Sequence, residues 1–445
     1  MASRTLIKTR QYILVYIFFE LSLISISIFL ASITSDVDYR TQFYTIVILF
    51  LWPIFSYLGN RYENIFVKEK FIHFIFKLLL SSAIIIFAYS FLATTLDLFK
   101  ILKSEYQVSF SYIFLFKTLI FNLFFNLFFQ PIFNKFFKVK RKIEVWNFIG
   151  SDNTFLMIKK SLSDKKYKNF LKVKKISKSF VNNLEDKKII IDHQNNIENF
   201  YYSLLDENIE NISDVLNIED WYEKVFEKIP INLFTLENIY QLKLASKNNF
   251  SNKIKRIGDI VFSVLILLLT FPISLISALL ISLEDQGPIF YKQKRVGLNG
   301  KIFNIYKFRS MDVKAESEGI KWATKNDPRT TKIGRLLRNT RFDEIPQLLT
   351  VLRGEMSLIG PRPERPEIEK MLKKNIDHYN LKYLAKPGLS GWAQVNYPYG
   401  SSLNDSRNKL AYDIFYIKNK SIFLDLIIFI KTIRVVINFK RYGSN

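Results

Sequence analysis

Residues 260–283 read IVFSVLILLLTFPISLISALLISL, an apolar stretch long enough to cross a bilayer, with a proline near its middle. Pro272 removes one helical hydrogen bond and bends the helix axis. A bent segment can enter the membrane and return to the same face, whereas a straight one carries the following chain to the other side. We therefore expect a re-entrant helix over about residues 257–283, with a straight fifth span as the alternative.

Four further apolar stretches occupy the first third of the chain, and each can span a bilayer. Lys and Arg precede the first stretch, separate the second from the third and follow the fourth, so the positive-inside rule puts both ends of this region in the cytoplasm. The sequence predicts a multi-pass membrane protein with a four-helix transmembrane bundle in residues 1–141. The expected spans are residues 12–33, 43–58, 71–96 and 110–133.

The composition indicates which partners the protein binds and excludes several kinds of chemistry. Hydrophobic residues make up 49% of the chain, including 42 Phe, which is more than a soluble protein of this charge needs. A net charge of +24 beside so much apolar sequence favours a lipid bilayer and phosphorylated substrates as partners, and not nucleic acid. The absence of cysteine excludes disulfides, thiolate catalysis and cysteine-based zinc sites.

Residues 142–249 are more polar and alternate strand-like and helix-like segments, which predicts a small α/β domain in the cytosol. The expected strand at residues 144–149 ends at Gly150-Ser151-Asp152, where a dinucleotide-binding fold has its glycine-rich turn. Gly150 is the only glycine of this region, and side chains elsewhere in the turn would keep a pyrophosphate away from the backbone. We expect a degenerate Rossmann-like domain that is not catalytic.

Residues 289–311 read IFYKQKRVGLNGKIFNIYKFRSM, in which Asn299-Gly300 predicts the turn of a β-hairpin. Cations alternate with strand-forming residues on both sides of that turn. This hairpin, which contains Arg295, Lys307 and Arg309, is therefore expected to present a basic surface to lipid or substrate phosphates, the alternative being an ordinary solvated hairpin.

Asp343 and Glu344 stand between Arg341 and Pro346. Proline is tolerated in a first helical turn, so we expect a helix to begin near Asp343, where free amides and the helix dipole favour carboxylates and phosphates. A carboxylate there would stay ionised. Simple helix capping is the alternative. Further on, the two prolines around Arg362 fix the direction of a planar cation suited to phosphate oxygens.

These segments resemble, in the same order, the monotopic phosphoglycosyl transferases, the bacterial sugar transferase family. The other segments that carry the resemblance are Gly334-Arg335-Leu336-Leu337-Arg338, Lys386-Pro387-Gly388-Leu389-Ser390-Gly391-Trp392-Ala393-Gln394-Val395-Asn396 and Tyr412-Asp413-Ile414-Phe415-Tyr416. The long form of this family also has four N-terminal spans and a degenerate nucleotide-fold domain. One departure is Phe271-Pro272, where the family commonly has Ser-Pro at the bend of the re-entrant helix.

The resemblance implies a reaction that moves a phosphosugar from a UDP-sugar to polyprenyl phosphate at the cytoplasmic face of the bacterial inner membrane, releasing UMP. It assigns Asp343 as the nucleophile and Glu344 as its support, both holding Mg²⁺. Arg362, with the three hairpin cations, would bind phosphate. Trp392 and Gln394 would shape the nucleotide or sugar pocket. The α+β catalytic domain would then comprise residues 250–445, anchored by the re-entrant helix.

Several alternatives remain open on the sequence. A membrane-bound nucleotide-sugar dehydratase or epimerase would use a Tyr-x-x-x-Lys pair such as Tyr416 and Lys420, but the chain has no G-x-G-x-x-G turn to accompany it. An inactive assembly scaffold is a second alternative, and a homodimer is possible. The apolar residues 421–437, interrupted by charges, form either a helix in the membrane interface or a core helix of the catalytic domain.

Overall fold

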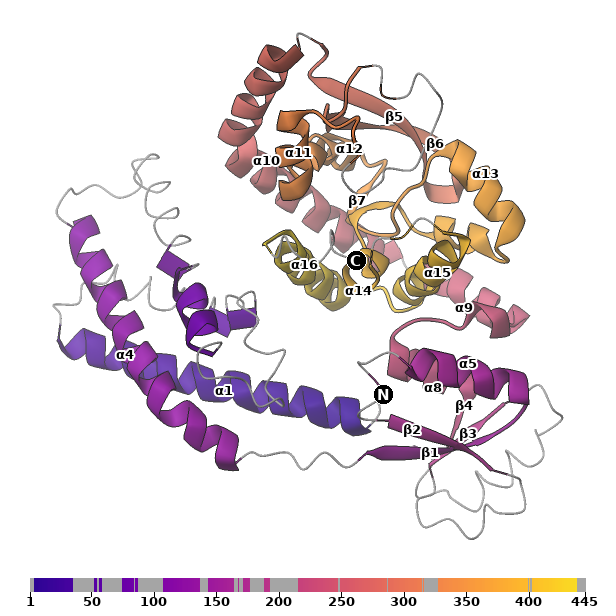
Figure 1. Cartoon of the computed structure of the whole chain (residues 1–445), viewed down its shortest axis with the longest axis horizontal. Coiled ribbons are helices and arrows are strands. Elements are labelled where there is room, and N and C mark those ends of the chain that lie inside the picture. The colour runs from indigo at the N-terminus through magenta and orange to yellow at the C-terminus, as the bar shows by residue number, and fades with distance from the viewer. Residues whose placement is uncertain are drawn as a thin grey trace. The chain divides into compact units, whose positions relative to one another are not determined.

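The structure is a computed structural model of the whole chain, which divides into two compact units, Met1–Ile218 and Glu219–Asn445 (Figure 1). The residues that it describes are 4–34, 52–53, 56–57, 74–83, 85–86, 107–136, 143–163, 167, 171–176, 188–192, 215–246, 249–285, 287–313, 315, 327–398, 400 and 402–437.

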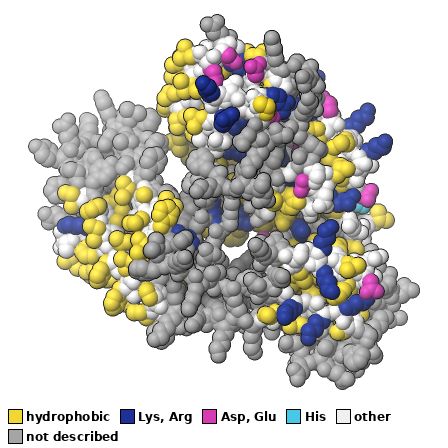
Figure 2. Space-filling view, in the orientation of Figure 1, with side chains coloured by type: hydrophobic (Ala, Val, Ile, Leu, Met, Phe, Trp, Pro, Cys, Tyr) yellow, Lys and Arg dark blue, Asp and Glu magenta, His cyan; other side chains and the backbone are white. Residues whose placement is uncertain are grey.

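Two long apolar helices belong to the first unit, α1 (Arg4–Ile33) and α4 (Gln107–Phe136). They pack against each other through aromatic rings, with the centroids of Phe19 and Phe133 4.3 Å apart. Their outward side chains are large and apolar, as expected for surfaces in contact with lipid (Figure 2). The first and fourth expected spans are thus confirmed as helices long and apolar enough to cross a membrane.

The second and third expected spans lie largely outside the described residues. Within residues 74–83 the structure has a shorter apolar helix. A third long apolar helix, in the second unit, includes residues 251–285. The protein is therefore a membrane protein with three long apolar helices among its described residues.

The α/β part of the first unit is a four-stranded parallel sheet in the order β2-β1-β3-β4. The strands expected at residues 144–149 and 188–191 are confirmed, as is the helix after the first strand. Buried isoleucines fill all of β3, as the centre of a sheet covered on both faces requires. The bounds are β1 (Glu144–Ile149), α5 (Asp152–Leu162), β2 (Leu171–Lys175), β3 (Ile189–Ile191) and β4 (Val215–Asn217).

A side chain of the sheet occupies the place where a nucleotide-binding fold holds pyrophosphate. The Asp192 carboxylate accepts hydrogen bonds from the Thr154 hydroxyl at 2.6 Å and from the Ser151 backbone and hydroxyl at 3.3 Å, at the start of α5. A Cβ atom on Gly150 would lie 2.3 Å from the Cβ of Asp192, so glycine is needed here to admit the carboxylate. The amino terminus of α5 is therefore already supplied with a negative charge.

The second unit is an α+β fold whose core lies among short strands and the helices around them. Apolar side chains such as Leu348, Met356 and Ile414 are fully buried there. The helix α8 (Ile218–Phe226) leads into this unit. Its helices are α9 (Leu236–Ser246), α10 (Asn249–Asp285), α11 (Lys332–Thr340), α12 (Gln347–Arg353), α13 (Pro366–Asn375), α14 (Trp392–Asn396), α15 (Leu403–Lys418) and α16 (Ile422–Ile437). Its strands are β5 (Phe290–Val296), β6 (Ile302–Phe308), β7 (Ser357–Ile359) and β8 (Gly388–Ser390).

The predicted hairpin is confirmed. The strands β5 and β6 pair in antiparallel register from Phe290 opposite Phe308 to Val296 opposite Ile302. Asn299 and Gly300 make the turn with φ of 55° and 75°, the left-handed conformation that an Asn-Gly turn supplies at low cost.

The helix α10 carries Pro272 inside 37 helical residues and has a largely exposed apolar surface. Hydrophobic side chains gather over it in the space-filling view (Figure 2). Near its start, the Asp259 carboxylate accepts hydrogen bonds from the Ser357 hydroxyl and the Leu358 backbone, both at 3.0 Å. Near its end, Glu284 accepts from the Lys332 backbone at 2.8 Å. Both ends of α10 are thus bound to the same compact unit.

Candidate active site

The two adjacent carboxylates lie where the chain turns from α11 into α12. Arg341 ends α11 in the left-handed conformation, with φ of 61°, and this reversal starts a 3-10 turn over Phe342–Glu344. Pro346 then occupies the N-cap position of α12 with a helical conformation. Helical backbone therefore begins at the carboxylate pair as expected, although α12 proper begins at Gln347. Pro346 takes the N-cap position of α12, so neither carboxylate occupies it.

Glu344 is the carboxylate that carries the ion pairs. Its Oε1 atom lies 2.7 Å from Arg362 Nη2 and 2.8 Å from Lys307 Nζ. Burial alone would raise the pKa of the Glu344 carboxyl, but Arg362 and Lys307 outweigh it and hold that pKa well below its usual range. Glu344 is thus a fixed negative charge that orients two cations from different elements.

Asp343 differs from Glu344 in its hydrogen bonding and in the direction of its pKa shift. Its side chain is buried, and among the described residues no group donates a hydrogen bond to its Oδ1 atom. Burial raises the pKa of the Asp343 carboxyl above its usual range, and Lys307 opposes that shift. The expectation of a carboxylate kept ionised by the helix terminus alone is therefore too simple, because desolvation acts in the other direction. A buried carboxylate with an unsatisfied oxygen is costly to maintain, which makes Asp343 a candidate for a reactive group or a ligand.

Two of the three candidate cations of the hairpin are partly buried: Lys307, which contacts Glu344, and Arg295, which contacts the segment around Arg362. Burial lowers the pKa of Lys307, while Glu344 opposes the shift. Arg295 donates to the Pro363 backbone carbonyl at 3.0 Å and to Gln293 Oε1 at 2.5 Å. Burial lowers the pKa of Arg295 to about 10. Arg295 thereby holds the Pro-Arg-Pro segment on the strand β5.

The third cation of the hairpin has a different set of partners. Arg309 is almost fully buried and forms an ion pair with Asp285, at the carboxyl end of α10. A Cβ atom on Gly287 would lie 1.7 Å from Arg309 Nη1, so the chain needs glycine there to admit the guanidinium. Although Arg309 lies along the wall of the cavity described below, its contacts connect β6 to α10.

Trp392 and Gln394, the two residues expected in the pocket, occupy different environments in the structure. Trp392 is buried, donates to the Glu227 carbonyl at 2.9 Å and stacks on Phe415, so it belongs to the core. Gln394 lines the cavity and donates to the Leu389 carbonyl at 3.2 Å. Of the two expected pocket residues, the structure therefore places one in the wall of the cavity and the other behind it.

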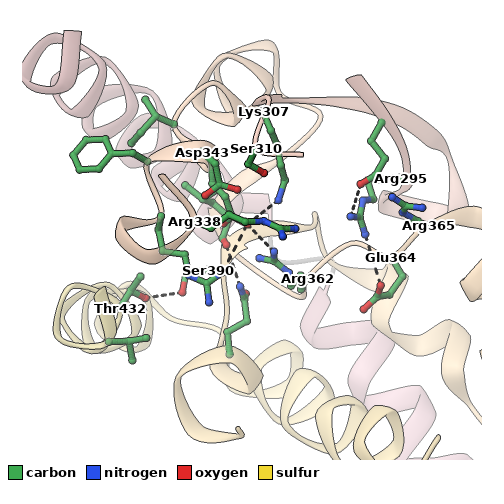
Figure 3. Close-up of a pocket in the computed structure, with 18 of the residues that line it drawn as sticks. Arg295, Lys307, Ser310, Arg338, Asp343, Arg362, Glu364, Arg365, Ser390 and Thr432 are labelled. Carbon is green, nitrogen blue, oxygen red and sulfur yellow. Dashed lines mark hydrogen bonds and ion pairs between the residues drawn. The ribbon is translucent and has the colours of Figure 1, made fainter. Parts of the chain in front are cut away.

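A cavity of about 1000 Å³ joins these residues, enough for a nucleotide sugar and part of a second substrate. In Figure 3, Lys307, Arg338 and Arg362 point toward the part of the cavity where Asp343 lies. The wall also contains cations that the sequence did not assign to the site: Arg329, Arg338, Arg341, Arg365, Lys382 and Lys409. Arg338 and Arg341 follow each other at helical spacing just before the carboxylates, a signal that was available. Lys409 lies far along the chain, and only the fold brings it here.

The cavity also has a polar face on α15. Asp413 on α15 lines it and is fully buried, and burial raises the pKa of the Asp413 carboxyl to about 7. Ser406, Lys409 and Asp413 follow one another at helical spacing on α15 and all line the cavity. This face therefore offers a hydroxyl, an ammonium and a carboxyl group as hydrogen-bonding partners for a ligand.

The arrangement defines a class of protein: a membrane-anchored domain in which a buried carboxylate lies beside a cation-rich cavity suited to phosphoryl chemistry. Residues 250–439 match the family described as bacterial sugar transferase. The carboxylate pair, the hairpin and the Pro-Arg-Pro segment all lie inside this range.

Curated relatives agree with this match. The chain is 44% identical over 184 residues to the UDP-N-acetylgalactosamine-undecaprenyl-phosphate N-acetylgalactosaminephosphotransferase of Aeromonas hydrophila, covering 41% of this chain and 44% of that protein. It is 37% identical over 207 residues to the UDP-glucose:undecaprenyl-phosphate glucose-1-phosphate transferase of Escherichia coli (strain K12), covering 46% and 44%. A transferase of the same name from Caulobacter vibrioides is 40% identical over 181 residues, covering 40% of this chain and 68% of that protein.

The chain therefore belongs to the bacterial sugar transferase family. The match covers less than half the length of the first two relatives.

Proposed function

We propose that this protein transfers a sugar phosphate from a UDP-sugar to polyprenyl phosphate, specifically undecaprenyl phosphate, giving polyprenyl-diphosphate sugar and UMP. The observation that carries the proposal is the unequal state of two adjacent buried carboxylates. Glu344 is neutralised by two cations, whereas Asp343 keeps an oxygen without a hydrogen bond among the described residues. The names of the relatives, all sugar-phosphate transferases to undecaprenyl phosphate, support the same reaction.

The proposed reaction has two steps. In the first, a carboxylate oxygen of Asp343 attacks the sugar-bearing phosphorus of the UDP-sugar, and the bond from that phosphorus to the bridging oxygen breaks, so UMP leaves with the electron pair. In the second, an oxygen of the polyprenyl phosphate attacks the same phosphorus and displaces the Asp343 carboxylate. Arg362 and Lys307, already oriented on Glu344, would offset the charge that develops on the phosphoryl oxygens.

The residues present fit a magnesium ion only with help from the substrate. Among the described residues no cluster of three or more His, Cys, Asp or Glu could hold a metal. Magnesium commonly uses one or two carboxylates and completes its shell with substrate phosphates and water. The unsatisfied oxygen of Asp343, with Glu344 beside it, would hold the ion in that manner. When bound, Mg²⁺ would neutralise charge on the diphosphate.

We further propose that α10 is re-entrant and that the catalytic domain, residues 250–445, lies on the cytoplasmic face of the inner membrane. A straight helix of 37 residues would be about 55 Å long and would carry its two ends to opposite sides of the roughly 30 Å hydrocarbon core. The bonds of Asp259 and Glu284 to the same unit support a helix that enters and returns. UDP-sugars are made in the cytosol, which favours that face.

The remaining parts would serve this reaction without chemistry of their own. We propose four spans in residues 1–141 and a non-catalytic domain in residues 142–249, since Asp192 fills the place of a pyrophosphate there. The proposed site residues all come from one chain, so a homodimer would not be needed to complete the site. The reaction would be the first membrane step of surface polysaccharide synthesis.

A direct assay tests the proposal. The full chain in lipid nanodiscs is supplied with undecaprenyl phosphate, Mg²⁺ and, in turn, UDP-glucose, UDP-galactose and their N-acetylated relatives. We expect UMP and a lipid-linked sugar in equal amounts with at least one donor. If no donor gives UMP, the enzyme proposal fails and an assembly scaffold becomes the better interpretation. Bound NAD in the purified protein would instead favour a dehydratase or epimerase.

A further inference from the structure

One wall of the active-site cavity is apolar, and two helices build it. Most of the residues on α16 follow the spacing of one helical face, so they form a stripe along that helix, with Val435 at its edge. The residues on α10 are one turn apart, directly before Phe271 and Pro272. The wall, called here the α10–α16 wall, consists of Ile266, Thr270, Phe429, Thr432, Ile433, Val435 and Val436.

The hydroxyl groups in this wall need no ligand. The Thr270 hydroxyl donates to the Ile266 carbonyl at 2.7 Å. The Thr432 hydroxyl donates to the Ile428 carbonyl at 2.7 Å and lies 2.6 Å from the Ser390 hydroxyl, a contact visible in Figure 3. Because these groups are satisfied within the protein, the α10–α16 wall presents hydrocarbon to the cavity. It contrasts with the opposite, cationic part of the same cavity.

Among the described residues, α10 and α16 are joined by side-chain contacts near their starts. Near their starts, Lys255 and Asp425 form an ion pair of 2.6 Å. One to two turns further on, the rings of Phe262 and Phe429 lie 5.8 Å apart. Beyond that ring pair, residues of both helices line the cavity. The apolar wall therefore lies on the side of the ring pair away from the ion pair.

The outer surface of α10 is apolar as well. On α10, Leu268 is 68% exposed and Phe271 is 65% exposed. Exposed aliphatic and aromatic side chains at this density are stable only in contact with another apolar phase. The cavity thus has a charged end at Asp343 and an apolar end that adjoins the surface of a membrane helix.

We propose that the α10–α16 wall is the passage through which the isoprenoid chain of the acceptor enters from the bilayer. This inference rests on the proposed function and adds the path of its lipid substrate. The chain would lie along the Phe429–Val436 stripe, with its phosphate directed to Asp343. Burial of isoprenoid carbons against this stripe would supply binding free energy roughly in proportion to the apolar area covered.

The experiment fills the passage and measures the two half-reactions separately, using the full chain in nanodiscs and a UDP-sugar that gives UMP. Ile433→Trp adds an indole to the centre of the wall. We expect the KM for undecaprenyl phosphate to rise about tenfold or more, because an overpacked wall excludes the chain. The burst of UMP formed with UDP-sugar alone should stay within about twofold of the native enzyme, since that step needs no acceptor.

A matched variant controls for the added indole. Leu268→Trp makes the same kind of change on the lipid-facing side of α10, outside the cavity wall. We expect its KM for undecaprenyl phosphate to stay within about twofold of the native value, because Trp is accepted at membrane surfaces. An Ile433→Trp enzyme with an unchanged KM would overturn the inference. A native enzyme without a UMP burst would instead contradict the covalent step of the proposed function.

A second measurement avoids any substitution. A polyprenyl phosphate with a diazirine in its third isoprene unit is irradiated with the native protein, and the labelled peptide is identified by mass spectrometry. We expect labelling in the segments that contain Ile266 or Ile433. Labelling confined to other segments would show that the chain takes another path.

Discussion

The Arg362 guanidinium lies 2.7 Å from the Glu344 carboxylate, in a pair that connects the Pro-Arg-Pro segment to the turn before α12. The flanking prolines restrict the backbone of Arg362, so this cation is held in place before any substrate arrives. Glu344 thus orients the cations proposed to bind phosphate, and Asp343 is the neighbour with an oxygen that accepts no hydrogen bond among the described residues. Because the two carboxylates have different partners, substitutions of Asp343 and of Glu344 should change the stability of the fold in opposite directions.

Asp343→Asn should abolish the covalent step. An amide cannot attack phosphorus, so we expect kcat to fall by about 10⁴-fold or more, as when a nucleophile is removed from a hydrolase. Intact-protein mass spectrometry should detect a phosphosugar adduct on the native protein with UDP-sugar alone, and none on the variant. Full turnover by Asp343→Asn would rule out Asp343 as the nucleophile.

The same two carboxylates should affect stability with opposite signs. Burial raises the folded-state pKa of Asp343, so its charge costs stability at neutral pH, and Asp343→Asn should stabilise the fold by about 1 kcal/mol. The folded-state pKa of Glu344 is lowered despite burial, because of Arg362 and Lys307, so Glu344→Gln should destabilise the fold by about 2 kcal/mol. Thermal unfolding followed by tryptophan fluorescence at pH 7.5 gives both signs.

The pH dependence of stability provides a further check on this pair. The contribution of Glu344 is present above its unfolded pKa of about 4.3 and is lost as the pH falls through its lowered folded pKa. The cost of Asp343 is full above its raised folded pKa and disappears below its unfolded value of about 3.9. The stabilisation by Asp343→Asn should therefore shrink as the pH is lowered toward 4. A constant difference across this range would contradict the assigned charge states.

Lys307 should set the acid limb of the pH–rate profile. Attack requires ionised Asp343, whose pKa is raised by burial and lowered by Lys307. Lys307→Met removes that cation, so the acid limb of the UMP burst should move to higher pH. The shift should be visible as a burst rate that is lost at the acid end of the profile and recovers as the pH is raised. A limb that stays in place, or moves to lower pH, would mean that another group controls this step.

Arg309 should behave as a structural residue despite its place in the hairpin. Its partner is Asp285 at the end of α10, so Arg309→Met and Asp285→Asn should each lower the unfolding temperature. The double variant should lose less than the sum of the two, because the pair is broken only once. The KM for UDP-sugar, measured on the folded fraction, should change by less than about threefold. A large rise in KM with unchanged stability would restore Arg309 as a phosphate ligand.

Two cations of the hairpin have partners that the local sequence pattern does not distinguish. Lys307 and Arg309 are two residues apart and share one side of an extended chain, so local pattern gives both the same expectation. The structure separates them, because Lys307 reaches Glu344 while Arg309 reaches the end of α10. Where α10 ends relative to β6 is a matter of tertiary packing, and no local signal encodes it.

The sequence predicts those structural features that depend on residues adjacent in the chain. The Asn299-Gly300 turn, the strand β1 and the carboxylate pair each depend on neighbouring residues, and all three were predicted from them. Trp392 was expected in the pocket, but its indole bonds to the Glu227 carbonyl, 165 residues earlier in the chain. A contact over that separation depends on the whole fold, so an aromatic residue in a motif could not be assigned to core or cavity in advance.

The path of α10 can be tested because the chain has no cysteine, so single cysteines can be introduced without a prior change. Lys253 precedes the apolar part of α10 and Lys301 follows it in the hairpin turn, and both side chains are exposed. If α10 enters and returns, Lys253→Cys and Lys301→Cys should both react with a membrane-impermeant maleimide in inverted vesicles and not in intact spheroplasts. If α10 crosses the bilayer, the two cysteines should react from opposite sides. Since each variant lies outside the cavity, UMP release should be retained, which ensures that the labelled protein is the active one.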